Sequence, residues 1–139
     1  MALLLRTEDV PFDCPDTVRI AFLSDLHFRK HSSKQAGRIV AVTVEAEPDL
    51  IMLGGDYVES AGSLPILKSM ATALTDRAPV FAIAGNHDYR MGITQIRSVL
   101  EDAGVRWVEK NTLNVLLKNQ TIAVHGNHTT LQCGDDQIP

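Results

Sequence analysis

The sequence is poor in cysteine, and the two cysteines that it contains exclude several classes of protein. Cys14 and Cys133 lie near opposite ends of the 139 residues, and no Cys-x-x-Cys pair is present. The chain therefore lacks the ligands of a zinc knuckle and the dithiol of a redox motif, and it is not a disulfide scaffold. Such cysteine usage favours a reducing compartment. We expect a cytoplasmic protein, or a membrane-associated one if an anchor lies outside this sequence.

Long apolar runs and an excess of positive charge are also missing. No segment approaches the roughly 18 apolar residues of a membrane span, and the first six residues are too short a run for a signal peptide. The chain has 13 Lys+Arg against 17 Asp+Glu, a net charge of -4. This balance argues against a general nucleic-acid-binding surface. With 9 Gly, 6 Pro and 45% hydrophobic residues, the composition is that of an ordinary globular protein.

The length predicts a single domain over residues 1–139. Residues 1–17 contain Pro11 and Pro15 and form a lead-in, while residues 125–139 hold few apolar side chains and are predicted to be a polar tail. Buried strands are predicted at residues 18–23, 50–53 and 80–84, and short strands at 105–108, 113–117 and 121–124.

Helices are predicted between these strands. Apolar side chains at i, i+3, i+4 and i+7 mark residues 67–74 and 96–103, with Ser63 as a candidate N-cap. Residues 36–44 fit both a helical stripe and a strand-like alternation of valines. A helix is favoured, because two parallel strands so close in sequence need a crossover connection.

Polar side chains follow the first three predicted strands, at the point where each strand ends. Asp25 and His27 follow the first strand, Asp56 follows the second, and Asn86 and His87 follow the third. Because the carboxyl ends of parallel strands meet at one edge of a sheet, these side chains should gather in one crevice. Carboxylates, imidazoles and an amide without thiolate suit manganese, iron, zinc or cobalt.

The amino-acid sequences of these three segments resemble the motifs of a known family. Ser24-Asp25-Leu26-His27, Gly55-Asp56 and Gly85-Asn86-His87-Asp88 are similar to the first three signatures of the calcineurin-like metallophosphoesterases. The resemblance covers residues 18–124 and is greatest to bacterial phosphodiesterase-type members. It implies an α/β fold, a metallophosphoesterase-like β-sandwich flanked by helices, of which this chain holds the first sheet and its helices.

The resemblance also implies a site for two divalent metal ions. Asp25 and His27 would bind the first ion, Asp56 would bridge both, and Asn86 would bind the second. The reaction implied is hydrolysis of a phosphate ester by a metal-activated hydroxide. His87 would assist the leaving group, with Asp88 orienting it.

The sequence departs from the family pattern in its last part. The family carries a later histidine and a final Gly-His-x-His motif, but this sequence contains no Gly-His pair. His125 and His128 are alternative nitrogen donors, although their order and spacing differ from the family's. The simplest interpretation is that the chain is the N-terminal half of such an enzyme, as a fragment, a truncated gene product or a divergent short member. We expect its second metal position to fill weakly and an uncovered sheet face to favour self-association.

Other functions are weighed against this one. A receiver-type signalling domain needs an adjacent acidic pair after the first strand, where only Asp25 is present. A nucleotide-binding module needs a glycine-rich phosphate loop, which the sequence lacks. A catalytically impaired metal-binding or interaction protein derived from the same fold remains open. The substrate, the identity of the metal and the oligomeric state are not readable from the sequence.

Overall fold

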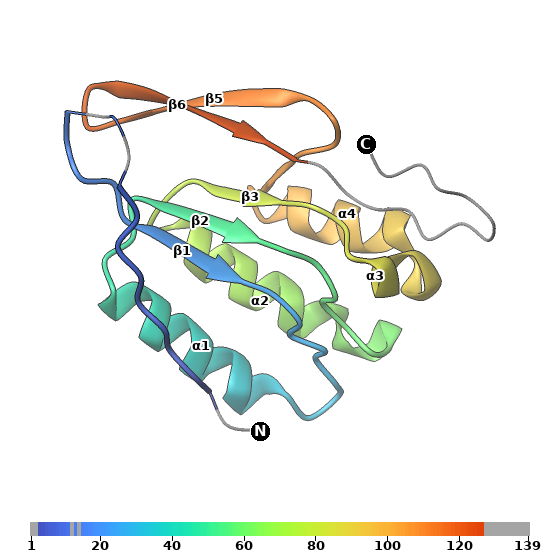
Figure 1. Ribbon diagram of the computed structural model, residues 1–139. Coiled ribbons are helices and arrows are strands. Elements are labelled where there is room, and N and C mark those ends of the chain that lie inside the picture. Colours follow the sequence, from blue (N-terminus) through green and yellow to red (C-terminus); the bar gives the residue numbers. More distant parts are fainter. Residues whose placement is uncertain (1–2, 12, 14, 127–139) are drawn as a thin grey trace.

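The computed structural model describes residues 3–11, 13 and 15–126, and its centre is a parallel sheet (Figure 1). The strands β1 (Ile20–Leu23), β2 (Leu50–Leu53), β3 (Val80–Ala82) and β4 (Arg106–Trp107) lie side by side in chain order. The strands β5 (Thr112–Leu117) and β6 (Gln120–His125) form an antiparallel hairpin. Four α-helices are described, α1 (Ser33–Glu45), α2 (Leu64–Thr75), α3 (Asn86–Met91) and α4 (Ile93–Asp102), with a 3-10 turn, η1 (Ala61–Ser63), before α2.

The predicted α/β architecture is confirmed, and so is the helical interpretation of residues 36–44. Helix α1 buries Ala36, Ile39 and Thr43, which fall on one face at helical spacing. It carries the chain from β1 to β2, whose residues pair in parallel from Ile20 with Leu50 to Leu23 with Leu53. The connection is therefore the crossover that two adjacent parallel strands require.

The helices cover one face of the sheet (Figure 1). Their apolar stripes meet the sheet in a core whose largest fully buried members include Phe28, Tyr57, Leu67, Leu74 and Leu100. Burying side chains of this size contributes about 1.5–3 kcal/mol each. This core fixes the positions of the strands, and hence of the loops that leave their carboxyl ends.

The hairpin covers part of the opposite face of the sheet. A second core forms there between the sheet and the hairpin, from Leu50, Phe81, Val108, Val115, Leu117 and Val124. The edge strand β1 extends beyond this cover, and its side chains Ile20 and Phe22 are 49% and 66% exposed. The predicted uncovered face is thus limited to β1, and self-association through it stays a prediction.

Ser63 is the N-cap of α2, as predicted, although its side chain makes no capping hydrogen bond. Two details differ from the sequence prediction. Helix α3 begins at Asn86, where a loop was expected. The predicted polar tail began at His125, but this residue ends β6. His128 and the rest of the tail lie outside the described residues. Among the described residues, no helix has both the length and the apolarity needed to cross a membrane.

Candidate metal centre

The loops that follow β1 and β2 stay paired beyond the ends of the strands. The backbone N–H of Asp25 donates to Gly55 O at 3.1 Å, and that of His27 donates to Asp56 O at 3.0 Å. Asp25, His27 and Asp56 have φ of 58°, 47° and 57°. The left-handed region is uncommon for residues other than glycine, and such residues gather at functional sites. Three predicted ligands therefore lie on strained, mutually paired backbone.

Two glycines bring the loop after β2 against the loop after β3. A Cβ added to Gly55 would lie 2.3 Å from Gly85 N, and a Cβ on Gly85 would lie 2.4 Å from Asp56 Oδ1. Gly55 also has a φ of 105°, which side chains disfavour. Only glycine fits this approach, so the pairs Gly55-Asp56 and Gly85-Asn86 serve to place the Asp56 carboxylate beside the start of α3.

The carboxylate of Asp88 fastens the same two loops together. Its Oδ2 accepts hydrogen bonds from Asp56 N at 2.8 Å and Gly85 N at 2.7 Å, and its Oδ1 accepts one from Tyr57 N at 3.0 Å. The side chain is fully buried, and burial raises its pKa although the three N–H groups favour its charged form. The Asp88 carboxylate thus holds the backbone of the two loops, a contact that the sequence did not predict.

Asp25, His27 and Asp56 form the first candidate metal group. One ligand atom of each lies within 4.8 Å of the others. The carboxylates are aligned by neighbouring donors, since Ser24 Oγ donates to Asp25 Oδ2 at 3.0 Å and the backbone N–H of His87 donates to Asp56 Oδ1 at 3.0 Å. Three of the four predicted metal ligands are therefore brought together.

The fourth predicted ligand, Asn86, is the exposed first residue of α3. It directly precedes His87, whose N–H holds the Asp56 carboxylate. Asn86 is therefore near the group in sequence and along the backbone, and its role as a ligand stays a prediction. His125 lies elsewhere, on β6, where its Nδ1 is 3.2 Å from Thr112 Oγ1.

Glu59 is a residue of the site that the sequence reasoning missed. Its Oε2 lies 2.6 Å from His87 Nε2, and its Oε1 lies 3.4 Å from His27 Nδ1. The hydrogen bond from His87 lowers the pKa of Glu59 against an opposing effect of desolvation, with smaller lowering contributions from the neighbouring His27 and Arg29. The carboxylate in contact with the ring of His87 is thus Glu59, while the orienting role expected of Asp88 stays a prediction. The sequence feature that could have indicated Glu59 is its position three residues after Asp56, on the same loop.

The donor set fits a divalent transition metal. Two carboxylates and an imidazole within 4.8 Å of one another supply negative charge and nitrogen without thiolate. The side chains present therefore fit the metal that the resemblance implies.

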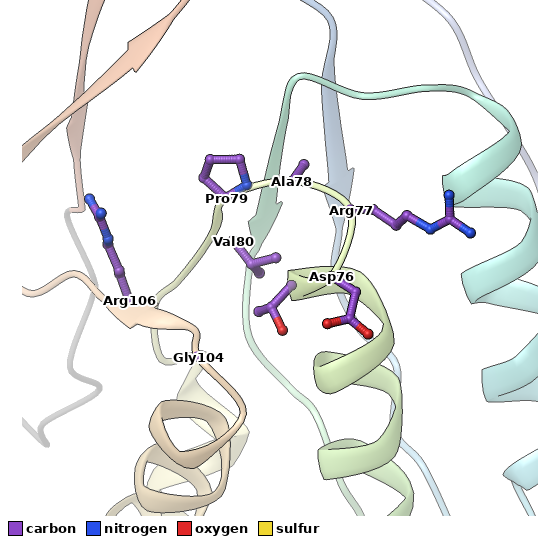
Figure 2. Close-up of a pocket in the computed structure, with 8 residues that line it drawn as sticks. Asp76, Arg77, Ala78, Pro79, Val80, Gly104 and Arg106 are labelled. Atoms are coloured by element: carbon purple, nitrogen blue, oxygen red, sulfur yellow. The ribbon is translucent and has the colours of Figure 1, made fainter.

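A separate pocket of about 420 Å³ lies at the opposite end of the sheet (Figure 2). It is lined by residues 75–80 with Gly104 and Arg106. These segments lead into β3 and β4, whereas the metal group follows the carboxyl ends of β1 and β2. The pocket is therefore no part of the candidate metal centre.

Comparison with known proteins agrees with this geometry. A sequence profile described as "Calcineurin-like phosphoesterase" matches residues 18–137. The chain is 34% identical over 93 residues to "Phosphodiesterase YaeI" of Escherichia coli, covering 63% of this chain and 34% of that protein. It is 31% identical over 104 residues to an uncharacterized metallophosphoesterase of Aquifex aeolicus, covering 73% and 39%. An uncharacterized metallophosphoesterase of Bacillus subtilis, YkoQ, is 30% identical over 93 residues, covering 63% and 34%. The chain thus spans 34–39% of the length of these relatives.

Proposed function

The chain belongs to the calcineurin-like phosphoesterase family, and from this we propose that it takes part in metal-dependent hydrolysis of a phosphodiester. The observation that carries the proposal is the grouping of Asp25, His27 and Asp56 ligand atoms within 4.8 Å, at the ends of two paired strands. A diester is favoured because one relative is named a phosphodiesterase. Two divalent ions, when bound, supply a water molecule of lowered pKa as nucleophile and neutralise phosphate charge.

In this proposal Asp25 and His27 hold the first ion, Asp56 is shared, and Asn86 reaches the second. Asp56 is suited to the shared position because the backbone N–H of His87 bonds to Oδ1 and not to Oδ2. The lone pairs of Oδ2 are therefore left for another partner. A carboxylate offers about four acceptor positions, enough for one N–H and two ions. Asn86 adds a neutral ligand where an anionic substrate has to bind.

His87 is the proposed proton donor to the leaving oxygen, and Glu59 is its positioning residue. The Nε2 of His87 lies 2.6 Å from Glu59 Oε2, so the carboxylate holds the ring through that nitrogen, and Nδ1 is the nitrogen that can donate a proton to the leaving oxygen. The His87 side chain is 25% exposed, which leaves it accessible to a substrate. A positioned imidazole contributes about 10²–10⁴-fold to such a step.

Metal binding is tested with Asp56→Asn. Calorimetry with Mn²⁺ should show the largest loss of affinity for this variant, because a shared ligand serves both ions. Asp102→Asn is the matched control, since Asp102 is an exposed residue at the end of α4 and should bind Mn²⁺ as the wild type does. Equal binding by the wild type and Asp56→Asn would show that the metal group is misassigned.

The role of His87 is tested with phosphodiesters whose leaving groups differ in basicity. His87→Ala should slow a substrate with a poor leaving group more than one with a good leaving group, because only the poor one needs a proton. Glu59→Gln should show the same selectivity to a smaller extent. An equal loss on both substrates would assign His87 to metal binding or folding.

The second candidate function is metal binding with impaired catalysis. It is favoured by the ligand count, because the first position has Asp25, His27 and Asp56, while Asp56 and Asn86 are the proposed ligands of the second. A metal position normally needs three or more protein ligands. If this second function is correct, one Mn²⁺ binds per chain and a chromogenic phosphodiester is not hydrolysed. Binding of two Mn²⁺ ions per chain together with hydrolysis would support the enzyme.

A further inference from the structure

A second group of metal-ligating side chains shares one member with the first. One ligand atom each of His27, Glu59 and His87 lies within 4.8 Å of the others. All three side chains are partly exposed, at 32%, 31% and 25%, so an ion can reach them and keep a water molecule. Two imidazoles and one glutamate are a ligand set used by zinc enzymes with one open position.

The distances in this group suit a tetrahedral ion. Two donors bound at about 2.0–2.1 Å lie about 3.3 Å apart at tetrahedral angles, and His27 Nδ1 lies 3.4 Å from Glu59 Oε1. The His87 contact with Glu59, at 2.6 Å, is a hydrogen bond that an ion would replace. The rings of His27 and His87 are 5.4 Å apart at 64°, an arrangement in which both can turn a nitrogen toward Glu59.

The two nitrogens of His27 face different groups. Nε2 lies 3.8 Å from Asp25 Oδ1, in the first group, and the buried Nδ1 points toward Glu59 without making a hydrogen bond. A neutral imidazole carries one N–H and one free lone pair. When Nδ1 binds an ion, Nε2 carries the proton. The Nε2–H can then donate a hydrogen bond to Asp25, as metal-bound histidines commonly do to carboxylates.

We propose that His27, Glu59 and His87 form an alternative zinc site that excludes an ion from the Asp25–His27–Asp56 group. The single lone pair of His27 makes the two positions compete. Their chemistry also sorts the ions, because the carboxylate-rich group suits Mn²⁺ while the imidazole-rich group suits Zn²⁺. The site itself does not depend on the proposed phosphoesterase activity. Its consequence does: an imidazole whose Nε2 binds zinc cannot also carry a proton on each nitrogen, so His87 is lost as the proposed proton donor and hydrolysis is inhibited.

The test is a titration of the purified chain with Zn²⁺ by calorimetry and with Co²⁺ by visible absorption. Glu59→Gln and His87→Ala should each weaken Zn²⁺ binding about tenfold or more, since losing even a supporting group of a metal ligand costs that much. Asp25→Asn keeps a side-chain oxygen that can accept the hydrogen bond from His27 Nε2, and it should leave the Zn²⁺ affinity within about threefold of wild type. His31→Ala, which removes an exposed histidine outside both groups, is the matched control and should bind Zn²⁺ normally.

Competition between the ions gives the second readout. Saturation with Mn²⁺ should raise the apparent Kd for Zn²⁺, and this effect should disappear in Asp25→Asn. Circular dichroism checks the fold of each variant, and two independent ligand substitutions keep the test decisive if one variant unfolds. Zn²⁺ binding that is lost in Asp25→Asn and kept in both Glu59→Gln and His87→Ala would overturn the proposal, as would simultaneous binding of Mn²⁺ and Zn²⁺ without competition.

These outcomes are separable from failure of the proposed function. If Zn²⁺ binding depends on Glu59 and His87 but no phosphodiester is hydrolysed, the zinc site stands and the enzyme assignment fails. If Mn²⁺-supported hydrolysis is lost in Asp56→Asn, and the Zn²⁺ affinity is unchanged in Glu59→Gln and His87→Ala, the proposed function stands and the zinc site fails.

Discussion

Replacing Asp88 with alanine tests how the site is held together. The substitution removes the acceptor of three backbone N–H groups, those of Asp56, Tyr57 and Gly85. The bond to Tyr57 is buried, and the other two are partly buried. A fully buried N–H left without an acceptor costs about 2 kcal/mol, and a partly buried one about 1 kcal/mol.

The three losses amount to about 4 kcal/mol. Removing the carboxylate also relieves the desolvation that raises the pKa of Asp88, which offsets part of this cost. We therefore expect Asp88→Ala to lower the free energy of unfolding by about 3 kcal/mol. That is a large share of the 5–15 kcal/mol by which most domains are stable.

Urea denaturation followed by circular dichroism measures this loss. Asp88→Asn keeps one oxygen acceptor and should therefore lose less stability than Asp88→Ala. It should still lose about 2 kcal/mol, because its amide N–H groups then face a backbone donor. Asp102→Ala removes an exposed aspartate at the end of α4 and should change stability by less than about 0.5 kcal/mol. An Asp88→Ala variant within about 1 kcal/mol of wild type would refute the reasoning.

Two further predictions concern the same loops. In Gly85→Ala the new Cβ would lie 2.4 Å from Asp56 Oδ1, so we expect calorimetry to show weaker Mn²⁺ binding and denaturation to show a loss of about 2 kcal/mol. The control is Gly37→Ala, in α1, where an added Cβ meets open space. It should stabilise the protein by about 0.5–1 kcal/mol. A loss of stability there equal to that of Gly85→Ala would contradict the steric argument. Because the pKa of Glu59 is lowered in the fold, its stabilising contribution is fully present above the pKa of the unfolded chain and is lost as pH falls through the folded value. Carboxyl NMR titration should show this lowered midpoint, and His87→Ala should raise it; an unchanged midpoint in His87→Ala would exclude the hydrogen bond as its cause.

The sequence was sufficient to predict the sheet and the grouping of three proposed ligands. Apolar runs at residues 50–53 and 80–84 end abruptly at Gly54 and Gly85, and the observed β2 and β3 begin at the predicted residues. Parallel strands that follow one another through helical crossovers bring their carboxyl ends to one edge. The meeting of Asp25, His27 and Asp56 follows from this rule without knowledge of any side-chain contact.

The roles of Glu59 and Asp88 required the structure. Glu59 meets His87 across 28 residues, and Asp88 meets Tyr57 across 31 residues. No local pattern encodes such contacts, because they depend on how two loops pack. Helix α3 was missed for a different reason: its six residues are too few to show a helical period.

The strained backbone explains why the ligands and the stability of the loops are linked. Three proposed ligands adopt positive φ, at a cost on the order of 1–3 kcal/mol each. Such conformations persist only where surrounding contacts determine them more than once. Here the pairing of the loops with each other holds Asp25 and His27, while the Asp88 carboxylate and the close approach of Gly85 hold Asp56. A change in either set of contacts should therefore displace a proposed metal ligand, and it also disturbs the core, because Phe28 and Tyr57 of these loops are fully buried in it.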